Sequence, residues 1–449
     1  MTLTLTRIIA GLVGLGALGV LGPWLATVLL DNVNDDPVRS LGVPVDTRLI
    51  ARGAYLAIAG DCAACHTAPG GRAFAGGLAL ATPIGAVYAS NITPDKETGI
   101  GNYSYGDFER ALRRGIRPDG STLYPAMPFP SYARVTDGDT KALYAYFQHG
   151  IVAVRQPDKS PDIAWPLSMR WPLTYWRWLF SPEVSETAQI SNADPLRDRG
   201  TYLVEGLGHC GACHTPRGLG LEEKALTDRD GPHYLSGSLV DNYVASDLRG
   251  DLLTGLGTWT QDDIVQFLQA GRNKNAAAFG GMSDVIIHST QGMHTEDIRA
   301  IAHYLKSLPA SGSETAFFYK IAVASALASG NVSMRGALDY LNNCAACHLS
   351  SGKGYSQTFP ALAGNPVVNT SDPSSLINIV LNGGTMPPTN AAPTHFTMPS
   401  LGARLSDQEV ADVLTFIRSS WGNRASSVVP LQVARMRSVT RTARREPSP

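Results

Sequence analysis

The first hydrophobic feature of the chain is an uncharged stretch from Ile8 to Leu30, with Arg7 before it and Asp31 directly after it. A helix of this length crosses a bilayer core of ~30 Å, and the positive residue at its start places the following chain outside the cytoplasm. A cleaved signal peptide is the alternative, although no small-x-small cleavage site is evident. We expect residues 1–31 to be a membrane anchor or signal segment, with the body at the periplasmic face of the inner membrane.

Beyond this stretch, the same order of apolar and polar segments recurs three times. Each copy begins with a helical pattern opened by Arg-Gly, reaches a Cys-x-x-Cys-His segment, and continues through a loop into an amphipathic helix that ends at a glycine. A methionine follows, and a second helix then closes the copy after a hydroxyl or acidic start signal. The Arg-Gly pairs start at Arg52, Arg199 and Arg335, the glycines are Gly115, Gly271 and Gly383, and closing helices are expected over 142–147, 298–305 and 410–417.

Two connecting segments have their own patterns. The segment from Trp165 to Phe180, between the first two copies, holds four of the seven tryptophans together with two arginines. Tryptophan beside arginine suits a membrane interface, and packing between neighbouring domains is an equal alternative. Residues 316–329 are apolar but too short to span a bilayer, so we expect a packed interdomain helix there.

Charge excludes one class of partner. The 37 Lys and Arg residues against 38 Asp and Glu leave no net positive field, so we expect no nucleic-acid ligand. The local exception is the C-terminal end, where six arginines between Arg424 and Arg445 face only Glu446. We expect a solvated, disordered tail, with attraction to anionic lipid as the alternative.

All six cysteines belong to the three Cys-x-x-Cys-His segments, so none remains for a disulfide framework. Two thiols one helical turn apart can bond to the two vinyl groups of a haem, while the adjacent histidine reaches the iron. Zinc would need four ligands from paired motifs, whereas these segments are more than a hundred residues apart. We therefore predict three covalently bound haem c groups. Their tethers are Cys62, Cys65, Cys210, Cys213, Cys344 and Cys347, and their proximal iron ligands are His66, His214 and His348.

A methionine recurs at one place in the repeat order and is the candidate sixth ligand. These residues are Met127, Met282 and Met398. A methionine sulfur on iron raises the reduction potential, which suits electron transfer rather than small-molecule chemistry. Met293 competes with Met282, and Met386 competes with Met398 because it too precedes a proline.

The chain lacks the motifs of a substrate-oxidising enzyme. It contains no Gly-x-Gly-x-x-Gly fingerprint, no phosphate loop and no His-Glu-x-x-His segment. We therefore assign no catalytic residue and expect a carrier of electrons, whose cofactors supply the redox chemistry. A multi-haem peroxidase and a freely diffusing electron shuttle are the alternatives.

At this point several motifs resemble the three-haem cytochrome c subunits of membrane-bound periplasmic dehydrogenases of proteobacteria, notably acetic acid bacteria. The similarity covers nearly all of residues 45 to 424. It rests on Asp61-Cys-Ala-Ala-Cys-His-Thr67, Ser90-Asn-Ile-Thr-Pro-Asp95, Leu123-Tyr-Pro-Ala-Met-Pro128, Trp165-Pro-Leu-Ser-Met-Arg170, His209-Cys-Gly-Ala-Cys-His214, Phe359-Pro-Ala-Leu-Ala-Gly-Asn365 and Trp421-Gly-Asn423.

The resemblance implies that electrons pass from a separate catalytic subunit through three haems to ubiquinone in the membrane. Catalytic partners in that family are quinoprotein alcohol dehydrogenases, flavoprotein gluconate or sugar dehydrogenases, and molybdopterin aldehyde dehydrogenases with an iron-sulfur or small third subunit. The apparent N-terminal anchor resembles the aldehyde-oxidising type, which we favour, with the alcohol and gluconate types as the alternative.

The predicted fold class is mainly α: three tandem class I cytochrome c domains preceded by an N-terminal transmembrane helix. A domain of about 100 residues is of ordinary size. The predicted parts are an anchor or signal segment over 1–31, cytochrome c domains over 40–155, 191–312 and 331–424, an aromatic linker over 156–190, an interdomain helix over 313–330 and a basic tail over 425–449.

Overall fold

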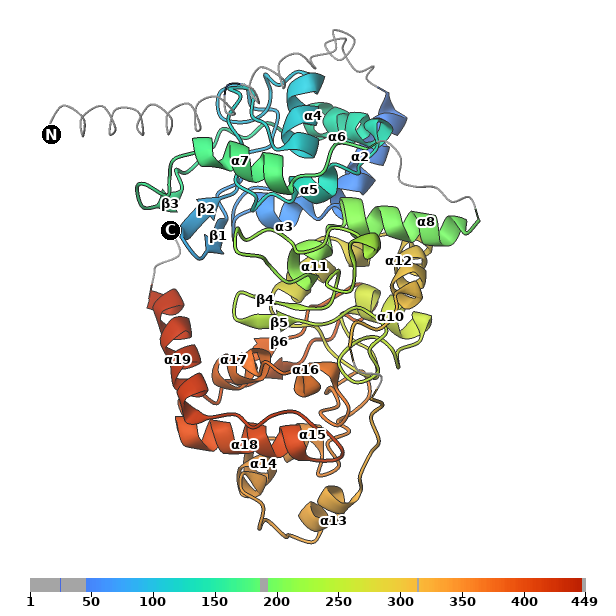
Figure 1. Ribbon diagram of the computed structural model, residues 1–449, viewed down its shortest axis with the longest axis vertical. Helices are drawn as coiled ribbons and strands as arrows, with labels where there is room; N and C mark the ends of the chain where they lie inside the picture. The colour runs from blue at the N-terminus through green and yellow to red at the C-terminus, as the bar shows by residue number, and fades with distance from the viewer. Residues whose placement is uncertain (1–24, 26–45, 186–192, 313–314, 446–449) are drawn as a thin grey trace, which may run out of the picture. The chain divides into compact units, whose positions relative to one another are not determined.

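A computed structural model describes residue 25 and residues 46–185, 193–312 and 315–445 (Figure 1). The chain separates into two compact units. The first consists of Met1–Ala57 with Cys65–Thr187, and the second of Ile58–Ala64 with Ala188–Pro449, as far as these ranges are described. The first repeat falls mostly in the first unit, and the second and third repeats share the second unit.

The first repeat combines helices with a small antiparallel sheet of order β1-β2-β3. The β1–β2 hairpin pairs Ala79 with Tyr88. The third strand follows the closing helix of this repeat and pairs with β2, with Ile163 opposite Gly85. The elements are α2 (Thr47–Ala59), α3 (Cys62–His66), β1 (Ala79–Thr82), β2 (Gly85–Tyr88), α4 (Tyr105–Arg114), α5 (Phe129–Tyr132), α6 (Asp137–His149), β3 (Asp162–Ile163) and α7 (Trp171–Phe180).

The second repeat follows the same order, with a π-helical turn before its cysteines. Its elements are α8 (Pro195–Thr201), η2 (Tyr202–Leu207), α9 (Gly211–His214), η3 (Asp228–Asp230), β4 (Ser238–Val240), β5 (Tyr243–Ala245), α10 (Gln261–Ala270), α11 (Gly281–His288), η4 (Thr290–Gly292) and α12 (Thr295–Ser307).

The third repeat is built from shorter elements and ends in a long helix. They are α13 (Ala322–Ala328), α14 (Ala337–Asn343), α15 (Ala345–His348), α16 (Pro366–Asn369), α17 (Ser374–Asn382), β6 (Gly384–Thr385), β7 (Thr397–Met398), α18 (Asp407–Ser419) and α19 (Pro430–Arg445). The predicted closing helices 142–147, 298–305 and 410–417 are confirmed, because they lie within α6, α12 and α18.

Local sequence explains where the repeated helices begin and end. In α4, Ser104 and Asp107 form a capping box, in which each side chain accepts from the other's backbone N–H. Thr260 and Asp263 do the same at the start of α10. Both helices stop at a glycine in the left-handed region, Gly115 in α4 and the equivalent residue in α10, a conformation that other residues adopt at a cost.

The repeated Arg-Gly pair joins the first helix of each copy to its closing helix. Arg199 donates from Nε and Nη2 to the Asp297 carboxylate at 2.7 and 2.6 Å, and Arg52 donates to Asp139 at 2.7 Å. The glycine beside each arginine lets the two helices approach closely. A Cβ at Gly53 would overlap the carbonyl oxygen of the residue opposite it on α6, and the same holds in the other two copies.

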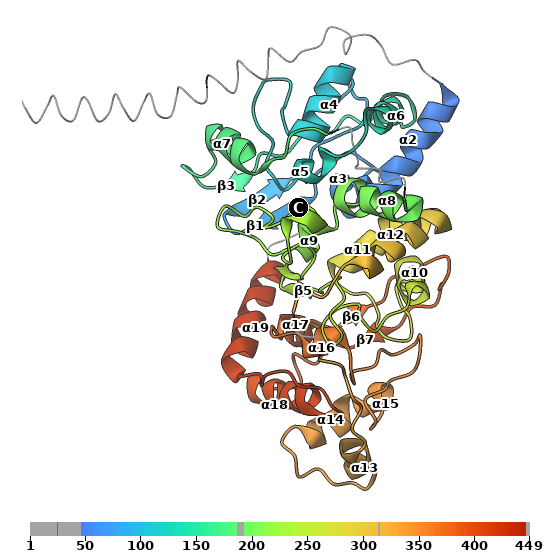
Figure 2. The same ribbon diagram turned by 45° about the vertical axis from the view of Figure 1, so that its right-hand side comes forward.

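The core of the third repeat is closed by the C-terminal helix. Val433 is fully buried and Met436 is 7% exposed, and both belong to the cluster that contains Trp421. Figures 1 and 2 show α19 lying beside α18 and α17. The expectation of a disordered basic tail is therefore wrong: Val433 and Met436 bury against the repeat, and Arg437 donates to the Asp407 carboxylate at 2.8 Å.

Two other connecting segments pack on neighbouring parts of their own unit. In α7, Trp176 meets the ring of Phe129 with centroids 5.9 Å apart, whereas Trp165 and Trp178 remain 79% and 68% exposed. The expected interdomain helix begins only at Ala322, and its buried residues join the core of the third repeat. The domain limits expected from the sequence stay predictions.

The predicted fold class is wrong on two counts. Within the described residues, no helix is long and apolar enough to span a bilayer, and the proposed anchor from Ile8 to Leu30 lies outside them except for Leu25. The described chain is also not purely helical, because short antiparallel strand pairs accompany the helices. These strands have two to four residues each, too few for alternation of apolar and polar positions to show in the sequence.

Candidate functional site

Each Cys-x-x-Cys-His segment forms one helical turn, and the histidine at its end is hydrogen-bonded to a backbone carbonyl from a later part of the chain. The three Nδ1 atoms each lie within hydrogen-bonding distance of a backbone carbonyl: His66 to Ser90 at 2.7 Å, His214 to Ser246 at 2.7 Å, and His348 to Pro360 at 2.9 Å. A carbonyl oxygen only accepts, so Nδ1 carries the proton and donates it. The second nitrogen, Nε2, is thereby left with a lone pair to offer to a metal.

The surroundings keep these imidazoles neutral. Burial lowers the pKa of His66, His214 and His348, and the hydrogen bond to the carbonyl opposes this only in part. A neutral imidazole is the form that binds iron, and a hydrogen-bonded Nδ1–H fixes the ring orientation and makes Nε2 more basic. The same arrangement recurs at all three motifs, so each imidazole is neutral and oriented as an iron ligand would need to be.

None of the six cysteines forms a disulfide, and two lie on each turn. Burial raises the pKa of Cys210 to about 12 and that of Cys344 to about 12, so these thiols are protonated at neutral pH. The residues between the cysteines are alanine or glycine in every copy, which leaves room for a flat ring against the turn.

This donor set fits covalently bound haem. Each turn offers two thiols for the vinyl groups and one oriented imidazole for the iron, and a porphyrin supplies the other in-plane ligands. Each cysteine pair and the histidine after it lie on one short turn of the chain, and their roles as haem tethers and iron ligands stay predictions.

The candidate methionines come from three different kinds of element. Met127 lies in a turn and donates its N–H to the Tyr124 carbonyl at 3.1 Å. Met282 lies in the first turn of α11, and Met398 lies in β7 opposite Gly384. Their pairing with the histidines stays a prediction.

The competing methionines have contacts of their own. The sulfur of Met293, which is 7% exposed, accepts from Ser289 Oγ at 3.9 Å. The sulfur of Met386 accepts from Arg272 Nη1, also at 3.9 Å. Met398, by contrast, packs against the hydrophobic core of the third repeat.

Sequence reasoning missed two polar residues that precede the first cysteine of a motif. Asp61 and His209 both have left-handed backbone, with φ of 52° and 39°. His209 Nε2 lies 3.3 Å from the Gly60 carbonyl oxygen. Burial, and secondarily the charge of Asp284, raises the pKa of Asp61 to about 8. Their equivalent place before the cysteine in the repeat alignment was the available signal.

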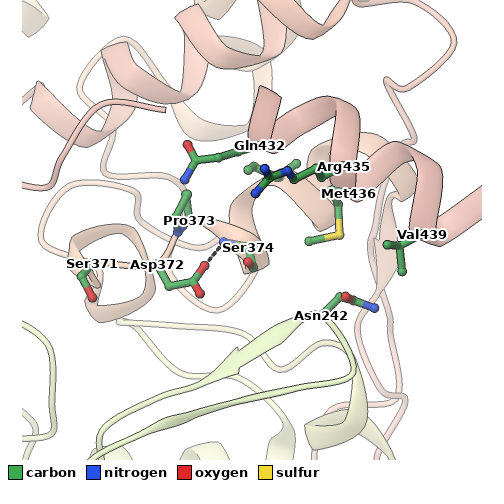
Figure 3. Close-up of a pocket in the computed structure, with 10 residues that line it drawn as sticks. Asn242, Ser371, Asp372, Pro373, Ser374, Gln432, Arg435, Met436 and Val439 are labelled. Atoms are coloured by element: carbon green, nitrogen blue, oxygen red, sulfur yellow. Dashed lines mark hydrogen bonds between the residues drawn. The ribbon is translucent and has the colours of Figure 1, made fainter. Parts of the chain in front are cut away.

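A pocket of about 430 Å³ lies away from the motifs, between α17, α19 and the turn joining β4 to β5 (Figure 3). Its lining includes Asn242, Asp372 and Arg435, and the Asp372 carboxylate accepts from the Ser374 N–H at 2.8 Å. None of the predicted haem tethers or ligands lines this pocket.

Comparison with known proteins gives consistent matches. The family Cytochrome c matches residues 333–421. The gluconate 2-dehydrogenase cytochrome c subunit of Pantoea cypripedii is 56% identical over 386 residues, covering 85% of this chain and 87% of the relative. The cytochrome c subunit of the quinone alcohol dehydrogenase of Gluconacetobacter polyoxogenes is 53% identical over 86% of this chain and 83% of its own length. The fructose dehydrogenase cytochrome subunit of Gluconobacter japonicus is 36% identical over 90% and 86%.

The family match also corrects the predicted fold. It covers one region, in the third repeat, where three tandem class I domains were expected. The first two repeats carry additions that the third lacks, among them the three-stranded sheet around β2 and the π-helical turn η2. The three repeats therefore share the order of elements around their cysteine turns but differ in the elements that surround them.

Proposed function

This chain belongs to the cytochrome c subunits of bacterial dehydrogenases, and we propose that it carries electrons from a catalytic subunit through three haem c groups to ubiquinone. Membership of the family implies covalently bound haem c and a catalytic dehydrogenase subunit as partner. One observation supports three haems in particular: the histidine after each cysteine pair donates from Nδ1 to a carbonyl at 2.7–2.9 Å, at all three motifs.

The residues of the chain hold and orient the cofactor. The two cysteines of each turn would tether it, and His66, His214 and His348 would offer Nε2 to the iron. When bound, haem supplies reversible one-electron transfer. The carbonyls of Ser90, Ser246 and Pro360 keep the imidazoles in one tautomer and one orientation, so that the ligand does not have to reorganise.

Met127, Met282 and Met398 are proposed as the sixth ligands. In the third repeat, Met398 is supported over Met386 because it packs on the core of its own repeat, whereas the Met386 sulfur already accepts from Arg272. In the second repeat, the Met293 sulfur accepts from Ser289, which supports Met282. Thioether ligation would raise the potentials and close the sixth position.

The relatives favour a different branch from the one that the N-terminal segment suggested. Their names specify gluconate, alcohol and fructose dehydrogenases, so the preference for a molybdopterin aldehyde dehydrogenase is not supported. We propose a quinoprotein alcohol dehydrogenase or a flavoprotein gluconate dehydrogenase as the catalytic partner. The quinone acceptor and the place at the periplasmic face of the inner membrane are part of this proposal.

The test is to mature the full chain in the periplasm with and without a catalytic subunit of either type. Three haems per chain are expected from the pyridine haemochrome spectrum, together with quinone reduction that depends on substrate and on both subunits. Fewer than three haems would contradict the stoichiometry. Failure of the reduced catalytic subunit to reduce the cytochrome would contradict the partner.

A further inference from the structure

The loop between β6 and β7 in the third repeat rests on the second repeat, inside the second compact unit. Arg272, the residue after the glycine that ends α10, donates from Nη1 to the Thr394 carbonyl at 2.6 Å. The same Nη1 lies 3.9 Å from the Met386 sulfur, and the guanidinium carbon lies 5.5 Å from the centroid of the Phe396 ring. One side chain of the second repeat thus contacts this loop at three points.

The loop has little support from its own strands. It is closed by only two residue pairs, Gly384 with Met398 and Thr385 with Thr397. Residues 393–395 are exposed, so they bury little surface that could fix the loop. Within the loop, the Met386 N–H donates to the Phe396 carbonyl at 3.1 Å, and Thr389 and Ala392 exchange backbone hydrogen bonds at 3.3 and 3.1 Å. Outside it, the Phe359 ring lies 5.4 Å from the Phe396 ring.

Other contacts from the second repeat reach the same loop. Gln291 Oε1 accepts from the Asn390 N–H at 3.2 Å. A Cβ on Gly271 would come within 2.6 Å of the Pro387 ring, so the two chains touch at that point. Arg272 is the cationic member of this contact, and among the described residues it forms no ion pair with a carboxylate. The Arg272 guanidinium therefore contacts a carbonyl oxygen and an aromatic ring, which neutralise its charge less than a carboxylate would.

We propose that Arg272 is a positioning residue for the third haem site, which it acts on by holding the loop that ends in Met398. This inference rests on the proposed function, because it requires haem at Cys344 and Cys347. Holding the loop keeps the Met398 sulfur in place for the iron, and methionine ligation raises the reduction potential of the third haem.

The experiment uses the full holo-chain and three variants. Arg272→Gln removes the charge and most of the hydrogen bonds, Arg272→Lys keeps the charge but not the planar guanidinium, and Lys274→Gln is the matched control. Lys274 follows Arg272 by two residues in the second repeat, is 59% exposed, and pairs at 3.1 Å with Asp263 of the same repeat. Haem content and thermal unfolding show whether each variant is folded and loaded.

Spectropotentiometric titration and the red charge-transfer band of methionine-ligated ferric haem give the result. We expect Arg272→Gln to lower one of three midpoints and to weaken the band by about one third, since one site of three is affected. The midpoint and the band intensity of Arg272→Lys should lie between those of wild type and Arg272→Gln. Lys274→Gln should have the wild-type values of both. Three unchanged midpoints in a fully loaded Arg272→Gln variant would overturn the inference and leave the proposed function intact.

A double-mutant cycle identifies the site. In a Met398→Ala background, Arg272→Gln should produce no further fall in any midpoint, because the loop no longer supplies a ligand. A fall of the same size in that background would overturn the inference, since Arg272 would then act on another haem. A wild-type chain without haem at Cys344 and Cys347 would overturn both this inference and the three-haem proposal.

Discussion

The surroundings of the three motif histidines repeat closely, whereas those of the three candidate methionines differ in every copy. Each histidine donates to a carbonyl that follows it by 24, 32 or 12 residues. Among the methionines, Met127 is in a turn, Met282 begins a helix and Met398 is in a strand. The histidine contact therefore recurs although the chain between its two partners varies from 12 to 32 residues, whereas the methionines share no common element.

The largest effect should come from breaking a proximal turn. Cys344→Ala removes one of the two thioether bonds of the third site, so stable attachment there should be lost or strongly reduced. Haem content per chain should fall by about one third, since each site binds independently through its own pair. Pyridine haemochrome measurement on purified protein checks this, with Ser351→Ala as a control in the same repeat. Unchanged haem content would contradict the tether assignment.

Removing the methionine proposed as the sixth ligand should lower one reduction potential without removing a haem. Met398→Ala should lower one midpoint by on the order of 0.1 V, a fraction of the ~0.8 V range over which axial ligands act. Met386→Ala should change the midpoints much less, because its sulfur already has a partner in Arg272. Redox titration of the two variants compares them directly. The opposite ranking would assign Met386 as the ligand.

Adding a side chain where α2 and α6 approach closely should reduce the free energy of unfolding, whereas the same change at an open position of α6 should not. Gly53→Ala places a methyl group against the carbonyl oxygen of Ala142, and such overpacking costs about 1–3 kcal/mol. Gly138→Ala, in α6 of the same unit, meets nothing within 4 Å and should gain about 0.5–1 kcal/mol from helix propensity. Denaturant unfolding of both variants measures the difference. Equal stabilities would show that the close approach of α2 and α6 is not required.

The smallest expected effects are losses of unfolding free energy when the repeated Arg–Asp pairs are broken, and these losses should differ between the second and third repeats. Arg199→Gln breaks two short bonds to Asp297, whose side chain is only 12% exposed, and should cost about 1–2 kcal/mol. Arg335→Gln breaks a pair at 3.9 Å whose arginine is 81% exposed, and should cost less than about 0.5 kcal/mol. Unfolding free energies at two salt concentrations test the ranking. A larger loss for Arg335→Gln would contradict the assignment of these pairs.

Much of each proximal site could be predicted from the sequence because its parts are local. The cysteines and histidine lie within one turn, and capping signals such as Ser104 with Asp107 mark a helix start wherever they occur. The helix after Pro430 could not be predicted in this way. Its arginines suggested a solvated tail, and only the burial of Val433 and Met436 against the third repeat explains its order.

By itself, the sequence determined the three cysteine turns, their histidines, the repeated Arg-Gly pairs and the closing helices. These depend on spacing of a few residues and on backbone capping, which are encoded along the chain. The tertiary structure decided which carbonyl orients each histidine, which aspartate meets each arginine, and that Arg272 of one repeat contacts the methionine loop of another. Those contacts join residues far apart in the chain, so they exist only once the hydrophobic faces have packed together.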